Sequence, residues 1–130
     1  MNIIELIGRL FLSLIFLLEG VNKIFNYEET IEYMEFFNVP GYLLTPAIII
    51  EILFPLLVII GYKTKLAAVI LSFFSILLAI IFHSNFSDQM QLISFLKNFA
   101  IAGGFIIIFV YGPNKLSLDY FLNAKKNEFY

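Results

Sequence analysis

Four long apolar segments occupy most of this chain of 130 residues, and they restrict the folds that it can adopt. They run over residues 3–25, 42–60, 66–82 and 92–111. At about 1.5 Å per residue, each would form a helix able to cross about 30 Å of hydrocarbon, the third only just. None of the segments alternates between apolar and polar residues, so membrane strands are not expected. The sequence therefore predicts an all-α protein, a four-helix transmembrane bundle formed by a single domain of residues 1–130.

The composition favours a membrane protein over a soluble one. Hydrophobic residues make up 61% of the chain and charged residues 14%, and a soluble protein of this size could not bury so much apolar surface. The chain has no cysteine, which excludes disulfides, thiol chemistry and thiolate metal ligands. A net charge of −2 gives no indication of nucleic-acid binding or of a polybasic lipid-binding patch.

Polar connections separate the apolar segments. The first, residues 26–41, mixes acidic and large apolar residues at spacings of three and four. This pattern predicts a short amphipathic helix at the membrane interface, either a plain surface helix or a lid over a site. Residues 61–65 are few enough to form a tight turn between antiparallel helices. Residues 112–130, which begin with Gly112 and Pro113, are predicted to be a polar tail.

Basic residues divide unevenly between the two ends of the predicted bundle. Four crossings place both termini and residues 61–65 on one side of the membrane. That side carries Arg9, Lys63, Lys65, Lys115, Lys125 and Lys126, and the other carries Lys23 and Lys97. The positive-inside rule then places both termini in the cytoplasm. The chain is predicted to be a multi-pass protein of the bacterial inner membrane with a cytoplasmic tail.

Polar residues from all four segments gather in the outer half of the predicted bundle. They are Glu19, Asn22, Lys23, Glu51, His83, Lys97 and Asn98. Charged groups at this depth are costly unless they are paired, so we expect these side chains to converge on one cavity. Glu51 is the strongest candidate, because Pro55 leaves the Glu51 carbonyl without its usual donor at the same depth as the carboxylate. Lys23 and Lys97 are the expected donors.

The same residues also have plainer interpretations. Lys23 and Lys97 are placed where lysines snorkel to the outer interface, and Glu19 with Lys23 has the spacing of a structural i, i+4 pair. His83 stands where an ordinary interfacial residue would. A lone histidine among scattered carboxylates makes a weak metal site, so no metal is predicted.

Arg9, Gly20 and Gly104, like Pro55, are assigned structural roles. Arg9 lies on the same helical face as Gly20, and we expect it to anchor helix packing or a lipid phosphate at the inner end. Gly104 forms a small-xxx-small pair with Ala100, which lets another helix approach closely. A row of small residues in the third segment has the same meaning and comprises Ala68, Ser72, Ser75 and Ala79.

Several of these motifs resemble the DoxX family of small bacterial integral membrane proteins. The shared features are Glu19-Gly20-x-x-Lys23, Glu51-x-x-x-Pro55 followed by Gly61, and the region from Asn98 to Gly104. The turn at residues 61–68 is similar to the family's Gly-x-x-Thr-Arg-x-Ala-Ala connection, with Lys65 in place of the arginine. The resemblance runs over residues 8–119, and it implies a four-helix integral membrane protein.

The resemblance also implies a field of activity. Some relatives are linked to quinone-dependent oxidation of sulfur compounds together with another subunit, and others to membrane complexes that manage oxidative stress. We therefore hypothesise a membrane subunit of a quinone-linked oxidoreductase system, with the quinone in the outer half of the bundle. Glu51 or Glu19 would exchange protons with it, and the binding residues would be Lys23, Lys97, His83, Asn98 and Asn22. Phe16, Phe54, Phe73 and Phe95 are candidate walls for a flat ring, or else core and lipid-facing residues.

Two other classes of function stay open. One is a non-enzymatic scaffold that anchors a soluble or membrane partner through residues 28–35 or through the tail. The other is a small proton-coupled carrier. Four helices without a repeat leave little room for alternating access, so a carrier would require a homo-oligomer.

Overall fold

In a computed structural model, which describes residues 1–127, the chain folds into helices and their connections, with no strand in that range. The elements are α1 (Asn2–Phe25), α2 (Tyr27–Phe36), the 3-10 turn η1 (Gly41–Leu43), α3 (Leu44–Ile60), α4 (Thr64–Phe82), α5 (Gln89–Tyr111) and α6 (Leu118–Asn127). The predicted all-α class is confirmed. The four long helices end at residues 25, 60, 82 and 111, where the apolar segments of the sequence end.

Three stretches are long and apolar enough to cross a membrane, namely Gly41–Ile60, Thr64–Phe82 and Gln89–Tyr111. α1 is also long, at 24 residues, but it carries four charged side chains. Both of its cations point into the protein, since Arg9 is buried and Lys23 pairs with an acid of α3. The face of α1 that points outward is made of large exposed apolar residues such as Phe11 and Leu18.

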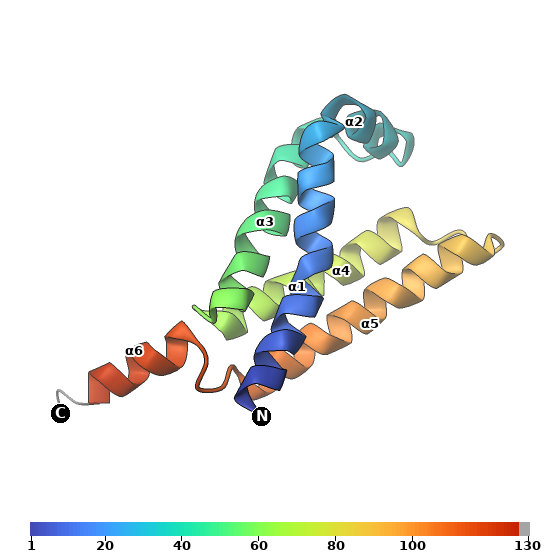
Figure 1. Cartoon of the computed structure of the whole chain (residues 1–130). Coiled ribbons are helices and arrows are strands. Elements are labelled where there is room, and N and C mark those ends of the chain that lie inside the picture. Colours follow the sequence, from blue (N-terminus) through green and yellow to red (C-terminus); the bar gives the residue numbers. More distant parts are fainter. Residues whose placement is uncertain (128–130) are drawn as a thin grey trace.

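The long helices form two pairs, α1 with α3 and α4 with α5. The short turn between α3 and α4 joins the pairs at one end, and α3 packs against α4 from there. Figure 1 shows that the pairs separate toward the opposite end, where α2 lies. The N-terminus and α6 lie at the joined end (Figure 1).

The hydrophobic core fills the space between the pairs where they are close together. Its buried members are Phe16, Val58, Ala67, Ala68, Leu71, Phe74 and Phe105. The Phe16 ring lies 6.3 Å from that of Phe74 and 5.8 Å from that of Phe105, so one residue of α1 contacts both α4 and α5. Above Phe16 the pairs diverge, and the core gives way to a cavity.

Small residues hold α4 against α5. Ser72 donates a hydrogen bond to the carbonyl of Ala102 at 3.1 Å, and Ser75 donates to that of Asn98 at 2.8 Å. Both serines belong to the small-residue row predicted from the sequence, all of which is buried. Within lipid the hydrophobic effect does not drive helices together, so close contacts and interhelical hydrogen bonds such as these drive the association of helices.

Gly104 lets α5 approach α1. A Cβ at this position would lie 2.8 Å from Leu12 Cδ2, which is closer than real side chains pack. The glycine of the predicted small-residue pair therefore faces α1.

Arg9 and a left-handed glycine shape the turn between α3 and α4. Gly61 has a φ of 79° and donates its N–H to the Leu57 carbonyl, which ends α3. Arg9 is fully buried and donates to the carbonyls of Val58 and Ile59 at 2.9 Å each. The arginine of α1 thus satisfies carbonyls that α3 leaves free at its end.

The segment after α5 returns to this turn and is held there. Arg9 donates a further hydrogen bond to the carbonyl of Leu116. The Asp119 carboxylate accepts the N–H groups of Lys63 and Thr64 at 2.8 Å each, and the Thr64 hydroxyl at 2.7 Å. A residue 55 positions away in sequence therefore caps the N-terminus of α4.

α6 lies within residues 112–130, which the sequence predicted to be a polar tail, and its helix was not predicted. Ser117 is the signal for it in the sequence, since its Oγ accepts the N–H of Tyr120 at 3.2 Å as N-cap residues do. Leu118, Phe121 and Leu122 then follow at the three- and four-residue spacing of an amphipathic helix.

Candidate ligand-binding cavity

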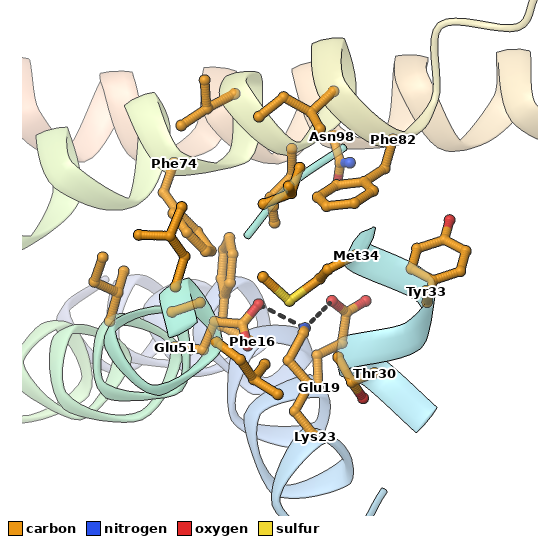
Figure 2. Close-up of a pocket in the computed structure, with 18 of the residues that line it drawn as sticks. Phe16, Glu19, Lys23, Thr30, Tyr33, Met34, Glu51, Phe74, Phe82 and Asn98 are labelled. Atoms are coloured by element: carbon orange, nitrogen blue, oxygen red, sulfur yellow. Dashed lines mark hydrogen bonds and ion pairs between the residues drawn. The ribbon is translucent and has the colours of Figure 1, made fainter. Parts of the chain in front are cut away.

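A cavity of about 470 Å³ lies between the two helix pairs at the end where they separate. Residues from α1, α3, α4 and α5 line it, and α2 closes one side (Figure 2). Its walls are mainly aliphatic and aromatic, with a few polar groups gathered among them. This size and lining suit a small lipophilic molecule, because such sites span roughly 300–1,000 Å³.

Glu51 and Lys23 form the polar centre of the cavity (Figure 2). The Glu51 side chain is fully buried, and its Oε1 accepts a hydrogen bond from Lys23 Nζ at 2.8 Å. Lys23 Nζ also lies 3.6 Å from Glu19 Oε2, one turn earlier on α1. The second oxygen of Glu51, Oε2, is buried without a hydrogen-bond partner in residues 1–127. A buried polar atom left without a partner is costly, so Oε2 is an acceptor that the described part of the chain leaves unsatisfied.

Gly20 explains why Glu51 and Lys23 meet. A Cβ on Gly20 would lie 2.9 Å from Ile52 Cγ1 and 3.3 Å from Glu51 Cβ, so only glycine lets α3 approach α1 this closely. Lys23 follows Gly20 by three residues and therefore shares its face of α1. Pro55 is also buried, one turn after Glu51 on α3.

Six of the seven polar residues predicted to converge do line this cavity. They are Glu19, Lys23, Glu51, His83, Lys97 and Asn98. Lys97 makes no ion pair with any residue of the described part of the chain, so Glu51 has Lys23 alone as its charged donor. The sequence could not distinguish the two lysines, because Lys97 lies on the pair of helices that diverges from α3.

Asn22 lies outside the cavity. It is exposed on α1, and its Oδ1 accepts a hydrogen bond from Asn26 Nδ2 at 2.9 Å. Asn22 lines a second, more polar groove between α1 and α2, which shares Glu19 and Lys23 with the cavity. The contacts of Lys23 with Glu51 and Glu19 therefore lie between the apolar cavity and the polar groove.

His83 reaches the cavity from the end of α4. Its Nδ1 lies 2.9 Å from Gln91 Oε1. An amide oxygen can only accept, so Nδ1 is the donor in this contact.

α2 contributes Thr30, Tyr33 and Met34 to the lining of the cavity, and the lid interpretation of residues 26–41 stays a prediction. Met34 is buried, and Tyr33 stacks on Phe82 of α4 with ring centroids 5.6 Å apart. Burial raises the pKa of the Tyr33 phenol above its usual value, so this group stays neutral and can both donate and accept. None of Tyr33, Met34 and Phe82 was predicted as a binding residue. Tyr33 and Met34 lie within the amphipathic pattern of residues 26–41, whereas Phe82 is the last residue of the third apolar segment.

The aromatic walls differ from those expected. Of the four phenylalanines named as candidates, only Phe16 lines the cavity, and Phe73 is 69% exposed on the outside of α4. Phe74 and Phe82 line it instead. Arg9 lies at the other end of the molecule and takes no part in the cavity. Within residues 1–127, no three His, Cys, Asp or Glu side chains are placed to hold a metal ion.

Comparison with known proteins identifies the family. The model of the DoxX family matches residues 4–84, which is more than half of the chain. The protein belongs to the DoxX family. The model of the SURF4 family matches residues 47–127 and so overlaps the DoxX match over residues 47–84.

Two relatives of this DoxX protein come from Escherichia coli strain K12. Inner membrane protein YqjF is 36% identical over 120 residues, which cover 92% of each chain. Inner membrane protein YphA is 31% identical over 124 residues, which cover 90% of this chain and 89% of YphA. No solved structure gives a significant match. Together with the candidate membrane spans, these names support an inner-membrane protein.

Proposed function

We propose that this DoxX protein is a membrane subunit of a quinone-linked oxidoreductase system, and that it binds a quinone-like ring molecule in the cavity between its helix pairs. The observation that carries the proposal is Glu51 Oε2, an unpartnered carboxylate oxygen in a mainly apolar cavity. Such a cavity accepts a lipophilic ring, while the few polar groups fix its orientation.

The polar groups of the cavity divide into two kinds. Lys23 Nζ, held by Glu51 and Glu19, is a donor for a ring carbonyl. Glu51 Oε2 is free to exchange a proton with the ligand, which is the role of a positioned general acid or base. Lys97 and Asn98 lie on the far wall and supply further donors to the same space.

The proposal includes a topology. The three candidate spans and α1 would form a four-helix bundle in the membrane, with α2 at the outer interface. Both termini would lie in the cytoplasm, since Lys63, Lys65 and Lys115 gather at the joined end of the helix pairs.

Binding of a soluble quinone analogue to the purified protein in nanodiscs tests the proposal. We expect saturable binding that weakens at least about tenfold in Glu51→Gln, because one polar contact is worth about 1.4 kcal/mol on this scale. Glu32→Gln on the exposed face of α2 is the matched control and should bind as the unmodified protein does. Absence of binding, or equal binding by Glu51→Gln, would contradict the proposal.

A second candidate is a scaffold that anchors a basic partner. Four exposed carboxylates on α2 make no ion pair with residues 1–127, and these are Glu28, Glu29, Glu32 and Glu35. Crosslinking in native membranes would then capture a partner that is lost when these residues are changed to glutamine. Isolation of the protein alone under the same conditions would exclude it.

A further inference from the structure

α6 is the one described helix that extends away from the helix pairs (Figure 1). Its first residues are nevertheless firmly placed. Asp119 bonds the start of α4, and its own N–H donates to the Gly61 carbonyl at 2.7 Å. The buried Ser117 lies against Gly61, where a Cβ on the glycine would clash with it. α6 therefore begins at a fixed level, that of the ends of α3 and α5.

One face of α6 is apolar and uncovered. Leu118, Phe121 and Leu122 share that face, with exposed fractions of 37%, 60% and 42%. Lys125 follows on the same face one turn later, and Asn123 lies on the opposite side. A helix with an apolar face and basic residues at its end has the pattern of helices that lie in a membrane interface.

Within residues 1–127, the unpaired charges around α6 are of one sign. The two carboxylates that the structure describes at this end are used inside the protein, since Glu5 pairs with Arg9 and Asp119 caps α4. The lysines make no ion pair with any residue up to Asn127, and they are Lys63, Lys65, Lys115, Lys125 and Lys126. The net charge of −2 hides this segregation, because the acids of α2 lie at the other end.

We propose that α6 lies in the headgroup region of the leaflet next to the α3–α4 turn, and that its lysines bind anionic phospholipids. Exposed apolar residues also end α3 and α5 at the level where α6 begins, since Ile60 and Tyr111 are 54% and 81% exposed. Five free lysines complement the negative surface of an anionic leaflet, where each contributes about fivefold in affinity. The occupant of the apolar face is therefore lipid, and the proposal is independent of the ligand in the cavity.

A single tryptophan provides the test, because the chain has none of its own. Phe121→Trp places the reporter on the apolar face, and Asn123→Trp places it on the opposite face as a control. Each variant is reconstituted in nanodiscs of phosphatidylcholine with brominated acyl chains, with and without phosphatidylglycerol. We expect strong quenching at position 121, weak quenching at position 123, and more quenching at 121 when phosphatidylglycerol is present.

Charge reversal separates the binding of anionic headgroups from insertion driven by the apolar face alone. Adding Lys125→Glu and Lys126→Glu to Phe121→Trp should lower the equilibrium constant for lipid binding of α6 by at least about fivefold per lysine in the anionic discs. Equal quenching at positions 121 and 123 would overturn the proposal. A blue-shifted but unquenched tryptophan at 121 would also overturn it, since a protein surface would then cover the face. Quenching that ignores both phosphatidylglycerol and the lysine changes would overturn the anionic-lipid part.

Discussion

Lys23 is the charged donor that pairs with the buried carboxylate of Glu51, and no other lysine or arginine in residues 1–127 pairs with that group. Glu51 has no exposed surface, whereas the Lys23 side chain keeps 21% of its own. The cost of burying the acid is therefore offset by a lysine that still reaches the polar groove at its other side. Such an arrangement is stable only while both members are present, because the loss of one leaves the other charge buried alone.

Changing Lys23 to methionine should show this dependence. We expect a loss of about 3 kcal/mol in the free energy of unfolding, at the lower end for a broken buried pair because Lys23 is partly exposed. Unfolding of the purified protein in mixed micelles with increasing dodecyl sulfate, followed by circular dichroism, measures it. Lys97→Met is the matched control, since it removes an unpaired lysine from the same cavity. Equal stability of the two variants would contradict the importance of the pair.

The sequence predicts the members of the cavity better than their pairing. Depth along each helix follows from counting residues, and this is enough to place Glu51, Lys23, Lys97 and His83 at one end. The pairing of Glu51 with Lys23 depends on rotation and on the distance between helices. Gly20 is the local sequence feature that indicates a short distance between α1 and α3. A glycine one turn before Lys23 lets a neighbouring helix approach the face of α1 that carries the lysine.

At the scale of elements, Gly20 of α1 and Gly103 of α5 differ sharply in what surrounds them. Gly20 is wedged against Ile52 and Glu51, whereas nothing lies within 4 Å of a Cβ built on Gly103. Glycine also weakens a helix by roughly 0.5–1 kcal/mol relative to alanine. The same change should therefore have opposite effects at the two sites.

Gly20→Ala should destabilise the protein by about 1–3 kcal/mol through overpacking between α1 and α3. Gly103→Ala should be neutral or mildly stabilising. The same unfolding measurement compares them, and ligand binding to Gly20→Ala reports whether Glu51 has moved away from Lys23. A Gly20→Ala protein as stable as Gly103→Ala would show that α1 and α3 are not in close contact.

α6 shows what sequence periodicity misses in short elements. Ten residues give too few repeats for the spacing of Leu118, Phe121 and Leu122 to stand out beside four long apolar runs. The capping of α4 by Asp119 could not be predicted at all, because it joins residues that only the fold brings together. The long helices were predictable because apolar length alone defines them.

The whole molecule is two helix pairs joined at one end, and the separation of the pairs could not be read from the sequence. The lengths of the apolar segments and of the loops determine the order and direction of the helices. The same lengths are compatible with pairs that run parallel and with pairs that diverge. The core cluster that joins the pairs includes Phe16, Phe74 and Phe105, and it ends at the cavity that Phe16 and Phe74 line.

The joined end and the α2 end should lie on opposite sides of the membrane. The chain has no cysteine, so Lys65→Cys in the first turn of α4 and Asn85→Cys in the α4–α5 connection give single labelling sites. We expect an impermeant maleimide to label Asn85→Cys in cells with a permeabilised outer membrane, and Lys65→Cys only after lysis. The opposite pattern would reverse the proposed orientation, and labelling of both in intact cells would contradict a spanning α4.

The contacts of Arg9 and Asp119 at the joined end affect the width of the cavity at the other end of the molecule. α4 is 19 residues long and so extends about 28 Å from the turn that these two side chains bind. A tilt of α4 by about 5° at that turn would shift its far end by about 2.5 Å. A small change in the contacts at the joined end would therefore change the width of the cavity at the other end of α4.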